Sequence, residues 1–136
     1  MIPLSCVMLV DDDTTTNYLN QRLLDRLGVA EQVLVAQDGQ QALTLITRHC
    51  QPKTPACPAL ILLDLNMPGM NGFEFLAAYQ QLAATQPMES VIVVLSSSLY
   101  PLDVQRTKEF AVSGYLSKPL TAEKVQQILQ QHFAQQ

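Results

Sequence analysis

Five short apolar segments recur along the chain, and each is followed at once by polar residues. They occupy residues 6–10, 32–36, 59–63, 91–95 and 114–117. A short apolar run that does not alternate with polar residues is typical of a strand covered on both faces, as in a parallel sheet. We therefore predict five short strands, the first of them fully buried.

The segments between these strands carry apolar residues at helical spacing. In the first segment, one face of the predicted helix consists of Tyr18, Leu19, Leu23, Leu24 and Leu27. A threonine, Thr14, Thr15 or Thr16, can cap the start of this helix, and Gly28 suits a left-handed helix end.

Four further helices follow from the same spacing and from turn residues. The second comes after the Asp38-Gly39 turn, and the third runs from about residue 73 to 84. Pro101 suits the first turn of the fourth, in which Val104 and Phe110 point inward, and Thr121 can cap the last. Strands that alternate with helices predict an α/β fold with a doubly wound parallel sheet and right-handed crossovers.

Composition narrows the class of protein. A chain of 136 residues with 48% apolar and 15% charged residues suits one cored domain, so we expect a single domain over 1–136 and no output domain. A net charge of −4 with only eight Lys and Arg disfavours direct binding of nucleic acid. Wholly apolar runs of about five residues are too short to cross a membrane.

The cysteines carry little chemistry at this stage. Cys6, Cys50 and Cys57 contain no CxxC pair, so we expect no disulfide framework and favour a reducing cytoplasm. Cys6 reads as a small buried apolar residue. His49 with Cys50 and Cys57 matches no familiar zinc spacing.

The polar residues that follow the strands are the candidates for function, because ligands of open α/β sheets bind at the carboxyl ends of the strands. Asp11, Asp12 and Asp13 follow the first strand and Asp64 the third, while Ser96 and Lys118 follow the fourth and fifth. If the first and third strands are neighbours, these carboxylates crowd together, which raises their pKa values unless a cation lies among them.

A hard divalent ion such as Mg²⁺ suits this set of oxygen ligands. The lysine and the serine hydroxyl could then neutralise the oxygens of a phosphoryl group. The residues therefore indicate a site at which a carboxylate becomes an aspartyl phosphate.

Four motifs in this order resemble the receiver domains of bacterial two-component response regulators, in their chemotaxis-regulator-like form. The motifs are LVDDD (9–13), LLDLNMPGMNG (62–72), VLSS (94–97) and GYLSKP (114–119). The resemblance covers about residues 5–133. It implies the flavodoxin-like receiver fold, with strand order 2-1-3-4-5.

The resemblance also implies a role for each acid. Asp64 is the expected phosphoacceptor and also a metal ligand. Asp12 is expected to bind Mg²⁺ directly, Asp11 to act largely through bound water, and Asn66 to offer its backbone carbonyl; Mn²⁺ is an alternative ion. A third acid, Asp13, extends the usual pair and leaves open which acid contacts the metal.

The remaining motif residues correspond to a switch. Ser96 is expected to move toward the phosphoryl group, Tyr115 to turn inward when it does, and Lys118 to bind phosphoryl oxygens, with Pro119 after a cis bond. Ser97 could replace Ser96, although the family's usual separation from the lysine favours Ser96. Asn66 and Ser98 lie where the family tunes the lifetime of the phosphate.

These inferences predict a stand-alone response regulator. A histidine kinase or histidine phosphotransfer protein would donate the phosphoryl group to Asp64, and the chain would promote its own phosphorylation and dephosphorylation without being a conventional enzyme. Output would be partner binding on the face formed by the fourth helix, fifth strand and fifth helix, or onward transfer.

Alternatives from other classes remain. The chain could be a receiver-like interaction module that never carries phosphate. A flavin-binding protein is disfavoured because three aspartates follow the first strand, and no GxGxxG or Walker loop occurs. A phosphatase with an aspartate nucleophile would want a second acid where Asn66 stands.

Overall fold

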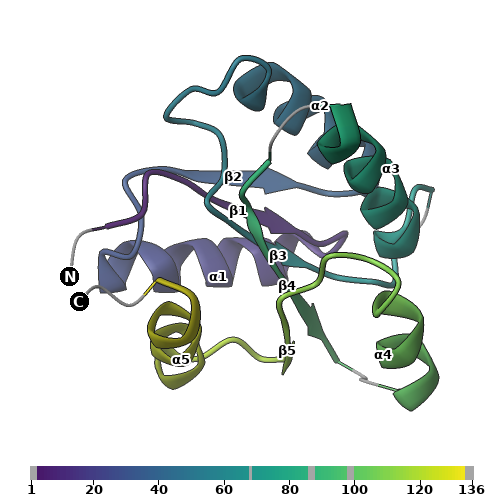
Figure 1. Cartoon of the computed structure of the whole chain (residues 1–136). Coiled ribbons are helices and arrows are strands. Elements are labelled where there is room, and N and C mark those ends of the chain that lie inside the picture. Colours follow the sequence, from purple (N-terminus) through teal and green to yellow (C-terminus); the bar gives the residue numbers. More distant parts are fainter. Residues whose placement is uncertain (1–2, 68, 86–87, 98–99, 134–136) are drawn as a thin grey trace.

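A computed structural model describes residues 3–67, 69–85, 88–97 and 100–133. Within them, strands and helices alternate from start to end (Figure 1). The elements are β1 (Val7–Val10), α1 (Thr14–Leu27), β2 (Val33–Ala36), α2 (Gly39–Cys50), β3 (Leu60–Leu63), α3 (Gly72–Thr85), β4 (Val91–Ser96), α4 (Pro101–Thr107), β5 (Gly114–Ser117) and α5 (Ala122–Phe133). The strands form one parallel sheet in the order β2-β1-β3-β4-β5, which confirms the expected fold class.

The sheet is covered on both faces. Its two apolar clusters separate alternate residues of the central strands, as the two-residue period of a strand requires. Met8, Ile61 and Ile92 belong to the cluster under α2 and α3. Leu9 and Leu62 belong to the other cluster, under α1 and α5 (Figure 1). All four residues of β1 and of β3 are buried, which is why both read as unbroken apolar runs.

Helix α1 departs from its predicted face. Tyr18 and Leu19 are 56% and 58% exposed, whereas Asn17 and Asn20 are buried together with Leu23 and Leu24. The buried face is rotated because the Asn17 amide donates a hydrogen bond of 2.8 Å to the backbone carbonyl of Asp11. A polar contact at the end of β1 thus takes precedence over two apolar side chains.

The ends of the helices are partly as predicted. Asp13, and not a threonine, caps α1, because its carboxylate accepts from the backbone N–H groups of Thr15 and Thr16. Gly28 ends α1 with φ 66°, as expected. The Thr121 hydroxyl accepts from the Lys124 N–H ahead of α5, which confirms that cap.

Helix α4 is shorter than predicted. It ends at Thr107, and Phe110 lies in the following turn, where its N–H donates to the Thr107 carbonyl. Phe110 still packs against the core from that turn.

Among the described residues, no helix combines the length and the hydrophobicity needed to cross a bilayer.

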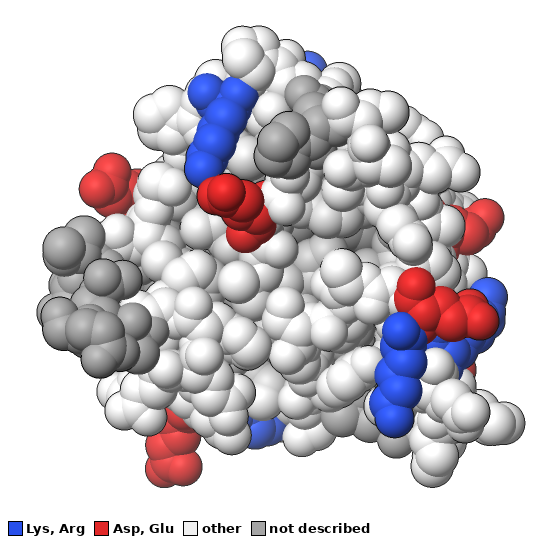
Figure 2. All heavy atoms as spheres, viewed as in Figure 1, with Lys and Arg blue, Asp and Glu red and all other residues white. Residues whose placement is uncertain are grey.

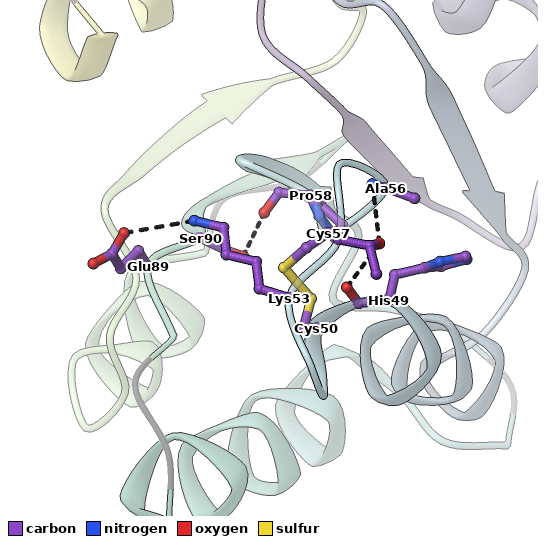
Figure 3. Close-up of a disulfide and its surroundings, with 9 residues drawn as sticks. His49, Cys50, Lys53, Ala56, Cys57, Pro58, Glu89 and Ser90 are labelled. Atoms are coloured by element: carbon purple, nitrogen blue, oxygen red, sulfur yellow. Dashed lines mark hydrogen bonds and ion pairs between the residues drawn. A yellow bond between two sulfur atoms is a disulfide. The ribbon is translucent and has the colours of Figure 1, made fainter.

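We expected no disulfide framework, but the structure contains one disulfide. Cys50 and Cys57 are bonded, with an S–S distance of 2.17 Å (Figure 3). The chain reverses direction after α2, which brings the two cysteines together in a way that their spacing alone does not indicate. Cysteine usage is therefore no argument for a reducing compartment.

Cys6 is fully buried, as expected, and burial raises the pKa of its thiol to about 11.

Candidate functional site

The carboxyl ends of β1 and β3 bring three acids together. In the parallel register Val10 pairs with Leu63, so Asp11 and Asp64 follow at the same level of the sheet. One carboxylate oxygen from each of Asp11, Asp12 and Asp64 lies within 4.8 Å of the others. Asp13 is not part of this cluster, because its carboxylate caps α1. We refer to Asp11, Asp12 and Asp64 as the acidic cluster.

Within the cluster, Asp11 is held tightly and Asp12 is not. One oxygen of Asp11 accepts from the Asp13 backbone N–H at 2.9 Å, and the other accepts from the Lys118 ammonium at 2.5 Å. Asp11 is 5% exposed, while Asp12 is exposed and makes no hydrogen bond to any of the described residues. Asp12 is therefore the more accessible of the two for a direct ligand bond.

Lys118 directly follows β5, the strand at one edge of the sheet. Ser96 pairs with Ser117 in the β4–β5 register, and the Lys118 N–H donates to the Ser96 carbonyl at 2.8 Å. The Lys118-Pro119 peptide bond is cis, as expected. The Lys118 ammonium lies 3.7 Å from a carboxylate oxygen of Asp64. Burial disfavours the charged ammonium, but the hydrogen bond to Asp11 and the charges of Asp64, Asp11 and Asp12 outweigh it, so the pKa of Lys118 is raised.

Asp64 is a buried member of the acidic cluster, with 6% of its surface exposed. Desolvation raises the pKa of its carboxyl group, and the like charges of Asp11 and Asp12 add to that increase. Lys118 and the Asn66 N–H, which donates to Asp64 at 3.3 Å, only partly oppose it. The cluster is thus short of positive charge, which is the condition under which a cation binds well.

The family model of the response regulator receiver domain matches residues 7–130. The chain belongs to this family.

Relatives and solved structures agree with the assignment. A probable chemotaxis protein CheY of Rhizobium etli is 31% identical over 93% of this chain and 91% of that protein. A two-component response regulator from Cytophaga hutchinsonii has a TM-score of 0.84 at 29% identity, over 96% of this chain and 97% of its own. The receiver domain of the histidine kinase CKI1 from Arabidopsis thaliana, solved with Mg²⁺, has a TM-score of 0.76 at 20% identity over 90% of each chain, a likeness of fold.

The predicted switch residues Ser96 and Tyr115 lie on the adjacent strands β4 and β5. Ser96 ends β4 and is fully buried, whereas Ser97 is exposed. Ser98 lies outside the described residues. The half-buried Tyr115 directs its hydroxyl to Thr107 at the end of α4, with the two oxygens 2.5 Å apart. Tyr115 therefore connects β5 to α4.

Two site residues were missed by the sequence reasoning. Asn17, 3% exposed, holds the backbone of Asp11, and Thr107, fully buried, holds the hydroxyl of Tyr115. A polar residue among the buried positions of α1 would have been a signal for Asn17. No pattern in the sequence distinguishes Thr107 from other polar helix residues, because its partner lies on another element.

Gly72, at the start of α3, packs closely against the backbone of Asp64 and Leu65. Its N–H donates to the Leu65 carbonyl at 3.1 Å. A Cβ atom at this position would lie 2.7 Å from the Asp64 carbonyl oxygen and 2.7 Å from the Leu65 Cα. Both are backbone atoms and cannot give way as a flexible side chain can, so a glycine is required here.

Gly72→Ala is expected to lower the free energy of unfolding by about 1–3 kcal/mol, because the methyl group forces the backbone of Asp64 and Leu65 to shift. Urea unfolding measures this change. Gly114→Ala is the matched control, since its Cβ would make only an ordinary contact of 3.7 Å with His132. Equal stability of the two variants would contradict the close-packing argument.

Proposed function

We propose that this chain is a phosphoacceptor receiver, in which Asp64 takes a phosphoryl group from a phosphohistidine of a kinase or phosphotransfer protein. The observation that carries the proposal is the convergence of Asp64, the acidic cluster and Lys118 in one place. These groups come from three different strands, and a carboxylate, a cation site and an ammonium are what phosphoryl transfer to an acid requires.

The residues present fit a magnesium ion. Mg²⁺ prefers oxygen ligands and binds through one or two carboxylates while keeping several waters. Asp12 and Asp64 would supply carboxylate oxygens, Asn66 its backbone carbonyl, and Asp11 an interaction through water. The ion, when bound, would neutralise negative charge on the phosphoryl oxygens. The Mg²⁺ in the CKI1 receiver structure supports this choice of ion.

The chain's own residues supply the rest of the chemistry. A carboxylate oxygen of Asp64 forms a bond to phosphorus, and the bond from phosphorus to the donor's imidazole nitrogen breaks, leaving the electron pair on nitrogen. Lys118 already lies between Asp11 and Asp64, so its ammonium can neutralise a phosphoryl oxygen after a small movement. Ser96 can donate a hydrogen bond to another oxygen.

Signal output would use the contact between Tyr115 and α4. The Tyr115 hydroxyl also lies 3.4 Å from the Val104 carbonyl, so a turn of the tyrosine toward Ser96 would break its contacts with α4. Phosphorylation would then shift the population of α4 positions. The partner surface would be formed by α4, β5 and α5. The face in view in Figure 2 is mostly uncharged and carries a few basic and acidic side chains, without a broad basic patch of the kind that binds nucleic acid.

The test is incubation of the whole chain with acetyl phosphate and Mg²⁺, followed by mass spectrometry of the protein and its peptides. The proposal expects a gain of one phosphoryl group on Asp64 that depends on Mg²⁺. A phosphoryl group on Asp12 or Asp13 instead would contradict the assignment of the acceptor. No gain under any condition would favour the interaction module that never carries phosphate.

Asp12→Ala is expected to weaken Mg²⁺ binding at least about 10-fold, because it removes a charged ligand of the cluster. Titration followed by NMR measures the affinity. Asp13→Asn is the control, because asparagine caps a helix about as well as aspartate and Asp13 lies outside the cluster. An equal loss of affinity in both variants would mean that Asp12 acts only through its long-range charge.

A further inference from the structure

The loop between α2 and β3 carries a second site of covalent chemistry that the receiver function does not use. Cys50 is the last residue of α2, and Cys57 lies shortly before β3 begins at Leu60 (Figure 3). Asp64 follows the opposite end of β3. We propose that Cys50 and Cys57 form a reversible thiol–disulfide exchange site, which reacts with small peptide thiols of the glutathione class.

Besides the disulfide, the loop contains hydrogen bonds that do not involve the sulfur atoms. The backbone N–H and the hydroxyl of Thr54 both donate to the His49 carbonyl, at 2.7 and 3.0 Å. The Cys57 N–H donates to the Thr54 carbonyl at 2.9 Å, and the Ala56 N–H to the Thr54 hydroxyl at 3.2 Å. The Cα atoms of the two cysteines are 4.9 Å apart. A reduced loop therefore keeps its thiols close enough to pair again.

A cavity of about 360 Å³ gives access to the disulfide. Both cysteines line it, together with Lys53 and Glu89, whose side chains form an ion pair of 3.8 Å and are 71% and 82% exposed. The volume suits a small ligand. A peptide thiol carries carboxylate and ammonium groups that complement this exposed pair. The wall of the cavity is fixed by Ser90, whose hydroxyl donates to the Pro58 carbonyl at 2.6 Å.

The exchange balances with two thiols as reductant. The thiolate of the first attacks one sulfur of the disulfide, the S–S bond breaks, and the other cysteine leaves as a thiolate and takes a proton. The second thiol attacks the mixed disulfide and frees the remaining cysteine. Two small thiols are oxidised to their disulfide, and the protein gains two hydrogens. Cys6 takes no part, because it is fully buried with a raised thiol pKa.

The experiment treats the folded chain with reduced and oxidised glutathione and counts free thiols with a maleimide label. We expect no label on the oxidised protein, two labels on the reduced protein, and three after denaturation of the reduced protein. Oxidised glutathione should then restore the unlabelled state. Three results would each overturn the proposal: labelling of Cys6 at the same rate as Cys50 and Cys57 in the folded protein, loss of the fold on reduction, or failure to re-form the disulfide.

A charge variant tests the role of the cavity. Lys53→Ala should slow reduction by glutathione several-fold but leave reduction by uncharged dithiothreitol unchanged, because only glutathione carries groups for the ammonium to attract. The matched control is Lys108→Ala, because Lys108 is an exposed lysine at the C-terminal end of α4. An unchanged rate with glutathione would overturn the assignment of the cavity. The site does not depend on phosphorylation, so a failure to phosphorylate Asp64 leaves this inference standing.

Discussion

Asp64→Asn is expected to abolish phosphorylation of the chain and to stabilise the unphosphorylated, metal-free protein at neutral pH. An amide oxygen is too poor a nucleophile to replace the carboxylate. The effect on stability follows from the raised pKa of Asp64, which means that the fold disfavours the charged carboxylate. Asparagine keeps the shape of the side chain and removes the charge, so the free energy of unfolding should rise by about 1 kcal/mol.

The dependence on pH has a definite sign. A carboxyl group with a raised folded pKa contributes stability below its unfolded pKa of about 4, and that contribution is lost as the pH rises through the folded pKa. The advantage of Asp64→Asn should therefore be largest at neutral pH and narrow as the pH falls toward about 4. Saturating Mg²⁺ should reduce the stability advantage of Asp64→Asn, because the wild type binds the ion more tightly than the variant does.

Urea unfolding at several pH values, with and without Mg²⁺, measures these changes. Asp25→Asn is the control for the loss of one negative charge, because Asp25 is exposed on α1, away from the acidic cluster. A variant less stable than wild type at neutral pH would show that the contact with Lys118 outweighs desolvation. Phosphorylation that persists in Asp64→Asn would remove Asp64 as the acceptor.

Lys118→Ala is expected to slow phosphorylation by acetyl phosphate about 100-fold or more, because it removes the one ammonium group in contact with the described acidic cluster. Mg²⁺ affinity should not fall, since the lysine repels the ion and does not bind it. The metal-free protein should lose about 1–3 kcal/mol of stability, because Asp11 and Asp64 are left buried without their counter-charge.

The rate, the Mg²⁺ affinity and the stability are measured on the same variant by mass spectrometry, calorimetric titration and urea unfolding. Lys108→Ala removes a positive charge from an exposed position and should leave all three unchanged. A parallel loss of Mg²⁺ affinity and rate in Lys118→Ala would mean that the lysine organises the metal site and does not act on the phosphoryl group.

Several features of the fold could be predicted because they depend on neighbouring residues alone. The apolar runs that form β1 and β3 are buried. Asp11 and Asp64, the residues that follow these strands, lie at the same edge of the sheet. Gly28 adopts the left-handed conformation that its place after a helix indicated. The order of the strands came from the resemblance to receiver domains, whose motifs this chain carries.

Other features depend on contacts between distant elements. Asp11 and Lys118 are separated by 107 positions in sequence, and the registers of β1 with β3, β3 with β4 and β4 with β5 together bring the ammonium to the carboxylate. The disulfide between Cys50 and Cys57 depends on how the chain reverses after α2.

The sequence by itself determined the types of the elements, the acceptor candidate and the lysine, because apolar patterns and the polar residues after strands are local signals. The tertiary structure alone decided that Asp13 caps a helix while Asp12 faces the cluster, and that Asn17 is buried where Tyr18 is exposed. The first depends on which backbone N–H groups the Asp13 carboxylate meets at the start of α1, and the second on packing and on one hydrogen bond from Asn17 to the end of β1; no local pattern encodes either.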